Sequence, residues 1–147
     1  MERYRLLIED KECWGCRACE VACKLDKPFQ ISLIRIQEEW KEDEDGNMEF
    51  IYRLRVCRHC EEPECAEACP EEAIYKREDG IVLIDRERCT GCGLCIEACP
   101  YDAIWIDEEK AIKCDMCFRR IEYGLLPVCA DGLCIGEAIR FEPVFED

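Results

Sequence analysis

The cysteine pattern constrains this chain more than any other feature. Sixteen cysteines occur in 147 residues, and they fall into four groups of four. The groups are Cys13, Cys16, Cys19 and Cys23; Cys57, Cys60, Cys65 and Cys69; Cys89, Cys92, Cys95 and Cys99; and Cys114, Cys117, Cys129 and Cys134. Four thiolates are the ligands of one [4Fe-4S] cluster, so the count matches four clusters and predicts a chain that transfers electrons.

The spacing within the groups favours iron–sulfur clusters over zinc. The third group, Cys89-x-x-Cys92-x-x-Cys95-x-x-x-Cys99-Pro100, follows the bacterial ferredoxin run, in which the fourth cysteine binds the other cluster of a pair. Three closely spaced cysteines put three sulfurs on one side of a tight loop, and the fourth corner of the cluster needs a sulfur from elsewhere. Structural zinc instead takes two C-x-x-C pairs, usually with a longer spacer between them. Zinc sites and disulfides remain the alternatives.

Composition ties folding to the clusters and limits the partners. Apolar residues make up 49% of the chain, but without the cysteines roughly 38% remain, which is little for an independent core. We therefore expect the chain without its clusters to be unfolded or aggregated. The formal charge is −15, and four oxidised clusters with their thiolates add about −8. Such a surface excludes nucleic acid and favours proteins with a basic face.

The chain shows no targeting or membrane signal. Its start, MERYRLLIEDKEC, has no apolar signal core and no twin arginine, and no stretch is long and apolar enough to cross a membrane. The sequence therefore predicts a cytoplasmic protein that does not insert into a membrane, and export together with a partner is the alternative. Scarce amide residues beside 37% charged residues are typical of hyperthermophile proteins, or simply of an acidic ferredoxin-like surface.

Alternating segments between the cysteine groups predict hairpins. A long hairpin is expected from 31–40 and 48–56, because Asp45-Gly46-Asn47 lies between them. Shorter hairpins are expected from 73–76 with 81–85 and from 103–106 with 110–113. Short helical turns are expected at AEACP and IEACP, and the dipeptide Ala-Ile recurs at 73, 103 and 138, which indicates internal duplication. Residues 119–128 predict a helix that ends in a loop, which either lines a cluster or docks a partner.

Several residues beside the cysteines have two interpretations. His59, the only histidine, is expected to lie beside the ligands of a cluster or on the surface rather than to bind iron. Trp14 is expected to shield a cluster from water, with contact to a partner as the alternative. Arg17, Lys24 and Arg58 either raise cluster potentials or are solvated charges.

The four motifs, in order, resemble one known family. ECWGCRACEVACKLDKP, CRHCEEPECAEACPEEAI, CTGCGLCIEACPYDAI and KCDMCFRRIEYGLLPVC are similar to the motifs of four-cluster iron–sulfur subunits of molybdopterin and tungstopterin oxidoreductases. The extra residues in the second motif and the long gap in the fourth are family features that simple ferredoxins lack. The resemblance implies an α+β, duplicated bacterial-ferredoxin-like fold, with two pseudo-symmetric dicluster lobes made of β-hairpins and short helices.

The resemblance also implies which cysteines share a cluster. The implied sets are Cys13, Cys16, Cys19 and Cys134; Cys57, Cys60, Cys65 and Cys99; Cys89, Cys92, Cys95 and Cys69; and Cys114, Cys117, Cys129 and Cys23. One lobe would combine 1–30 with 108–147, the other would be 50–107, and 31–49 would form a hairpin between them. Cys134 departs from the pattern, because four residues rather than three separate it from Cys129 and no proline follows it.

By the same resemblance, catalysis belongs to another polypeptide. The implied partners are a catalytic pterin–metal subunit and ferredoxin or another soluble redox carrier. The short length looks most like the small subunits of tungsten aldehyde oxidoreductases. Subunits of formate dehydrogenase or hydrogenase complexes and a free polyferredoxin are the alternatives.

Overall fold

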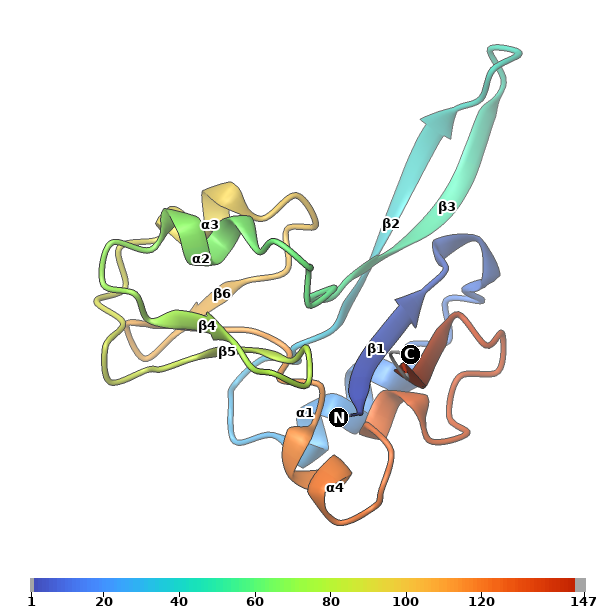
Figure 1. Ribbon diagram of the computed structural model, residues 1–147. Coiled ribbons are helices and arrows are strands. Elements are labelled where there is room, and N and C mark those ends of the chain that lie inside the picture. Colours follow the sequence, from blue (N-terminus) through green and yellow to red (C-terminus); the bar gives the residue numbers. More distant parts are fainter. Residues whose placement is uncertain (1, 145–147) are drawn as a thin grey trace.

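The computed structural model describes residues 2–144, which form short helices and small antiparallel sheets (Figure 1). The helices are α1 (Ala18–Asp26), α2 (Glu64–Ala68), α3 (Leu94–Ala98) and α4 (Phe118–Glu122), with 3-10 turns η1 (Asp10–Glu12) and η2 (Val128–Ala130). The strand pairs are β1 (Arg3–Ile8) with β8 (Ile139–Val144), β2 (Arg35–Glu42) with β3 (Met48–Arg55), β4 (Ile74–Lys76) with β5 (Val82–Ile84), and β6 (Trp105–Asp107) with β7 (Lys110–Ile112). The predicted mixture of α and β elements is confirmed.

Three of the four helices in residues 2–144 end where the sequence places a proline. α1 ends before Lys27-Pro28, α2 before Cys69-Pro70 and α3 before Cys99-Pro100. The residue that precedes a proline is driven out of the helical conformation, and all three have extended backbone angles. No helix among residues 2–144 has the length and apolarity needed to cross a membrane.

The first core joins the two ends of the described chain. β1 and β8 pair antiparallel with Leu6 opposite Phe141, so the blue and red ends of the ribbon lie side by side (Figure 1). Leu6 and Ile139 are buried with Leu33, Ile34, Ile36, Leu54, Val56, Ile81 and Met116. Burial of these side chains in a single cluster holds the first and last cysteine groups together.

A second, smaller core lies under α2 and α3. Its aliphatic members are Ala73, Ile74, Val82, Ile104 and Ala111. Two short hairpins cover it, β4–β5 with Ile74 opposite Ile84 and β6–β7 with Ile106 opposite Ala111. Both hairpins are confirmed. Ile81, which directly precedes β5, packs into the first core rather than into this one. The two cores are therefore joined. The division of the chain into lobes at the predicted boundaries stays a prediction.

The long hairpin β2–β3 projects from the body (Figure 1). The predicted hairpin is confirmed, but β2 begins at Arg35 rather than Ile31 because Leu33 and Ile34 are drawn into the first core. The Oδ1 of Asp43 accepts hydrogen bonds from the backbone N–H groups of Asp45 (3.0 Å) and Asn47 (2.8 Å). Gly46 takes φ +82°, a conformation that glycine adopts without steric cost, so the turn closes tightly.

Candidate metal centres

The structure brings the first cysteine group to the fourth. The Cys13 thiol interacts electrostatically with those of Cys16 and Cys134, and the Cys19 thiol with those of Cys13 and Cys134. Burial, assisted by these neighbouring thiols, raises the pKa of Cys19 to about 12. A buried thiol of this kind stays protonated unless a metal ion binds the sulfur and displaces the proton.

The rest of the fourth group surrounds Cys23. The Cys129 thiol interacts with those of Cys117 and Cys23, and the Cys114 thiol interacts with that of Cys129. Burial raises the pKa of Cys23, Cys114 and Cys129 above the usual value for a thiol. The loop that ends the 119–128 segment belongs to this neighbourhood, because Pro127, Val128 and Cys129 line one cavity with Cys23, Cys114 and Cys117.

The second and third groups exchange their last cysteines. The thiols of Cys60 and Cys65 interact with those of Cys57 and Cys99. Cys69 lines one small cavity with Cys89, Cys92 and Cys95. α2 and α3 lie against each other and carry these exchanged residues at their ends. Electrostatic interactions and shared cavities thus group the thiols into four neighbourhoods of four, and all sixteen are free.

Electrostatic interactions between thiols of different neighbourhoods indicate that the neighbourhoods form a series. The Cys129 thiol also interacts with that of Cys19, and the Cys114 thiol also interacts with that of Cys57. The neighbourhood of Cys114 therefore lies between those of Cys13 and Cys57, and the exchange of Cys69 and Cys99 adds the neighbourhood of Cys89 at the far side. Cys16 and Cys92, the two exposed cysteines, belong to the two end members.

The same backbone hydrogen bond occurs in each cysteine loop. The residue two positions after the first cysteine donates its N–H to that cysteine's Sγ: Gly15 to Cys13 (3.4 Å), His59 to Cys57 (3.3 Å), Gly91 to Cys89 (3.4 Å) and Met116 to Cys114 (3.3 Å). All four donors have positive φ, between 47° and 75°. Such donors stabilise a negatively charged sulfur, so the loops fit metal-bound thiolates. The sequence showed the glycines but gave no sign that His59 and Met116 adopt the same conformation.

The recurring Ala-Ile dipeptide has a structural role at two of its positions. Ala73 donates its N–H to the Sγ of Cys69 (3.4 Å), and Ala138 donates to the Sγ of Cys134 (3.3 Å). In both cases the alanine lies four residues after the last cysteine of a group. Cys134 is therefore held in the same local arrangement as Cys69, despite its altered spacing from Cys129.

Three lysines donate to backbone carbonyls of cysteines, which the sequence did not reveal. The Nζ of Lys76 donates to Cys60 O (2.8 Å), and that of Lys110 donates to Cys89 O. Lys113 is only 6% exposed, and its Nζ donates to Cys114 O (2.9 Å) and to Val82 O. Lys113 also interacts electrostatically with the thiols of Cys65 and Cys114. A buried cation is costly unless it is compensated, and thiolates on both sides would compensate this one.

His59 lies inside the protein rather than on its surface. It is 8% exposed, and its Nδ1 accepts a hydrogen bond from the N–H of Val82 (2.9 Å). Desolvation, reinforced by Lys113 and Lys76, keeps the pKa of His59 well below its usual value. The surface interpretation is therefore wrong. The backbone N–H of His59 donates to the Sγ of Cys57, which agrees with the expected position beside a cluster ligand.

Trp14 is largely exposed, and its role as a shield of a cluster stays a prediction. Its indole is 67% exposed, although one edge lies close to Gly136. The interpretation of Arg58 as simply a solvated charge is wrong, because its side chain is largely buried and donates to Leu54 O (3.2 Å). Arg17 and Lys24 donate to Ile36 O (3.1 Å) and Phe29 O (2.9 Å) but stay partly or fully exposed, so both interpretations remain predictions for them. Packing within the loops determines where these four side chains lie.

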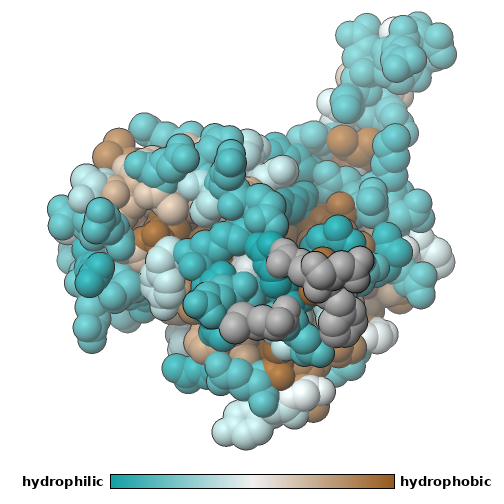
Figure 2. All heavy atoms as spheres, in the orientation of Figure 1, coloured by the Kyte–Doolittle hydropathy of each residue, from teal (hydrophilic) through white to brown (hydrophobic). Residues whose placement is uncertain are grey.

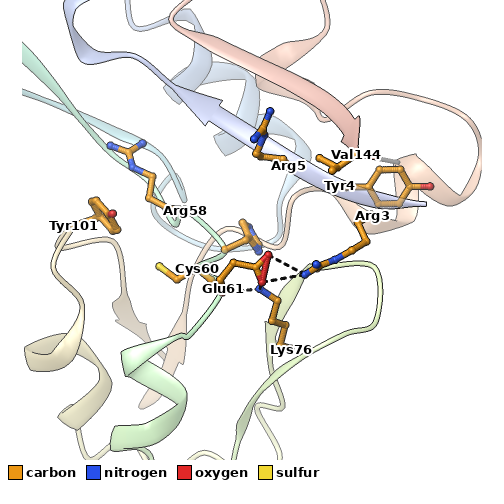
Figure 3. A pocket seen from close by; sticks show the side chains of 11 residues that line it. Arg3, Tyr4, Arg5, Arg58, Cys60, Glu61, Lys76, Tyr101 and Val144 are labelled. Carbon is orange, nitrogen blue, oxygen red and sulfur yellow. Dashed lines mark hydrogen bonds and ion pairs between the residues drawn. The ribbon is translucent and has the colours of Figure 1, made fainter. Parts of the chain in front are cut away.

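A basic cavity of about 420 Å³ opens beside one of these thiols. Figure 3 shows Glu61 between Arg3 and Lys76, with Cys60 close by; the carboxylate lies 3.1 Å from Arg3 and 3.2 Å from Lys76. Arg5 and Arg58 also line the cavity. The cavity concentrates positive charge near Cys60 on an otherwise acidic protein.

Comparisons with known proteins agree with this geometry. Two models described as 4Fe-4S dicluster domain match residues 48–143 and 12–73. A tetrathionate reductase subunit of Salmonella typhimurium is 40% identical, over 92% of this chain and 56% of that protein. An anaerobic dimethyl sulfoxide reductase subunit of Haemophilus influenzae is 37% identical, over 99% of this chain and 77% of that protein. A tetrathionate reductase subunit of Archaeoglobus fulgidus is 39% identical, over 82% of this chain and 58% of that protein.

This chain spans little more than half the length of the two tetrathionate reductase subunits. The family match nevertheless covers most of the chain, and the prediction of iron–sulfur clusters is confirmed in place of zinc or disulfides. With sixteen free thiols in four neighbourhoods, the cofactors are four [4Fe-4S] clusters. The chain belongs to the 4Fe-4S dicluster domain family.

Proposed function

We propose that this chain is the electron-transfer subunit of a reductase complex. It passes single electrons through four [4Fe-4S] clusters between a catalytic subunit with a pterin-bound metal and a soluble carrier such as ferredoxin. The observation that carries the proposal is the series of thiol neighbourhoods, whose two end members contain the exposed Cys16 and Cys92. A series with accessible ends suits electrons that enter at one end and leave at the other.

We assign four ligand sets in the order of that series. They are Cys13, Cys16, Cys19 and Cys134 (cluster 1); Cys114, Cys117, Cys129 and Cys23 (cluster 4); Cys57, Cys60, Cys65 and Cys99 (cluster 2); and Cys89, Cys92, Cys95 and Cys69 (cluster 3). The electrostatic contacts among the thiols and the cavity shared by Cys69 and Cys89 support this assignment. The iron supplies the redox chemistry, while the protein holds the thiolates and tunes them through backbone N–H groups and lysines.

The names of the relatives direct the choice of partner. They are subunits of tetrathionate and dimethyl sulfoxide reductases, and a thiosulfate reductase electron transfer subunit of Salmonella typhi is 35% identical. We therefore propose a molybdopterin reductase partner in place of the tungsten aldehyde oxidoreductase that the chain length suggested.

Native mass spectrometry of the protein purified without oxygen tests this function. The expected result is this chain with four clusters, bound to a larger subunit that carries a pterin and molybdenum. A lone chain with four clusters would contradict the subunit role and indicate a free polyferredoxin. Tungsten in the larger subunit would restore the aldehyde oxidoreductase interpretation.

Lys113→Met is expected to lower the reduction potentials of clusters 2 and 4. The buried ammonium group lies near Cys65 of one set and Cys114 of the other, so its charge favours the reduced, more negative state of both clusters. At an effective dielectric constant of about 20, loss of one charge corresponds to a shift of about 50–100 mV. Redox titration monitored by electron paramagnetic resonance measures the potentials.

Two further lysine variants make the measurement specific. Lys113→Arg keeps the charge and is expected to retain both potentials. Lys110→Met removes a half-buried ammonium beside Cys89 and is expected to shift cluster 3 alone. Equal shifts of all four clusters in Lys113→Met, or none, would contradict a local electrostatic effect.

A further inference from the structure

The hairpin β2–β3 has one aromatic face and one polar face. Among residues 2–144, β2 pairs with β3 alone. Trp40 lies opposite Phe50, and Glu38 lies opposite Tyr52. Because side chains alternate along a strand, these residues share a face with the pair Glu42 and Met48, whereas Lys41, Glu49, Glu39 and Ile51 belong to the other face. The hairpin therefore has two chemically different sides.

The aromatic rings form a continuous stripe, of which the body covers the inner ring, Tyr52, and leaves Trp40 and Phe50 uncovered. The rings of Trp40 and Phe50 pack edge to face with their centroids 5.3 Å apart, and the rings of Phe50 and Tyr52 do so with their centroids 5.1 Å apart. Trp40 is 66% exposed and Phe50 is 41% exposed. Figure 2 shows hydrophilic atoms gathered at the hairpin tip. Uncovered aromatic side chains of this kind are typical of the centre of a protein interface.

The stripe leads to the loop of cluster 1. The Tyr52 ring fills the space beside Gly15, where a Cβ would overlap the ring. Gly15 lies between Cys13 and Cys16, and Cys16 is exposed. A protein that covers Trp40 and Phe50 therefore also approaches the accessible end of the cluster series.

Charges around the stripe define its partner. Glu42 lies on the aromatic face, and Glu44 and Asp45 at the tip are exposed, whereas Glu38 on the same face pairs with Arg17 (3.4 Å). The chain carries a net charge of −15, so a second copy of the chain or an anionic membrane would be repelled. The complementary surface is an apolar groove with basic residues at its rim.

We infer that the aromatic face of β2–β3 docks this chain onto the catalytic subunit, in an apolar groove with a basic rim, so that electrons enter or leave through cluster 1. The inference rests on the function proposed above, because it takes the catalytic subunit as the occupant. The hairpin extends from the body and binds the catalytic subunit. Electrons then pass between that subunit and cluster 1 through the exposed cysteine loop at the base of the hairpin.

The test compares complexes purified without oxygen through a tag on this chain. In the variant Trp40→Thr/Phe50→Thr, the molybdenum or tungsten recovered per iron is expected to fall at least tenfold. The matched control, Lys41→Thr/Glu49→Thr, changes the neighbouring pair on the opposite face of the same strands and is expected to recover as much metal as the wild type. Equal recovery in the aromatic variant would overturn the inference.

Two further measurements keep the outcomes distinct. A wild-type chain that recovers no pterin metal would contradict the proposed function itself. If the aromatic variant loses iron, hydroxyl-radical footprinting of the wild-type complex decides the question: at least fivefold protection of Trp40 relative to the dissociated chain supports docking, and unchanged reactivity overturns it. In Glu42→Lys/Glu44→Lys, the association rate is expected to fall and to lose most of its dependence on salt.

Discussion

Cys134→Ser is expected to remove or degrade cluster 1 and leave the other three clusters intact. Cys134 lies with Cys13 and Cys19, and its Sγ accepts the N–H of Ala138, as the Sγ of Cys69 accepts that of Ala73. Loss of this ligand frees one iron corner, so iron falls from about 16 per chain to about 12 if the cluster is lost, or to about 15 if a three-iron form survives.

Iron analysis and electron paramagnetic resonance of the reduced protein check this prediction. The neighbouring change Ile135→Ser affects an exposed side chain and is expected to retain all the iron. Unchanged iron in Cys134→Ser would show that Cys134 is no ligand, as its irregular spacing from Cys129 would then suggest.

Double variants test which cysteines share a cluster with Cys134. Removal of two ligands from one cluster is expected to cost little more iron than removal of one, whereas ligands of two clusters contribute additively. Cys13→Ser combined with Cys134→Ser should therefore resemble a single variant, and Cys114→Ser combined with Cys134→Ser should lose a second cluster. The reverse result would place Cys134 in cluster 4.

Gly91→Ala is expected to destabilise cluster 3 severely, while Gly93→Ala in the same loop is tolerated. Both glycines have positive φ, 75° and 79°, so each alanine costs about 1–2 kcal/mol for its backbone conformation. A Cβ on Gly91 would also overlap the carbonyl oxygen of Glu109, whereas nothing lies within 4 Å of one on Gly93.

The difference between the two variants arises from the β6–β7 turn. Glu108 and Glu109 already have positive φ there, and Ala111 just beyond donates its N–H to the Sγ of Cys89 (3.3 Å). Displacement of this turn would break that hydrogen bond and raise the total cost to several kcal/mol, on the order of an overpacked core site. The rate at which the brown absorbance bleaches in denaturant should rise at least tenfold in Gly91→Ala, and far less in Gly93→Ala. Equal rates in both would contradict the steric argument.

The sequence by itself determined the cofactors and most of the local structure. Thiolate number and spacing define a cluster because they are covalent constraints within a few residues, and the hairpins and helix ends followed from turn residues and from prolines such as Pro70 and Pro100. The family resemblance added the expectation that Cys134 shares a cluster with Cys13, which cannot be derived from local spacing.

The tertiary structure decided the environment of each side chain. Burial of His59 and Lys113, exposure of Trp14 and Trp40, and the approach of Cys129 to Cys19 and of Cys114 to Cys57 all depend on segments far apart in the sequence. A lysine beside a cysteine has the same local pattern whether it is solvated or buried between two clusters. Only the packing of the two cores distinguishes these cases, because it fixes which surfaces are withdrawn from water and which remain for a partner.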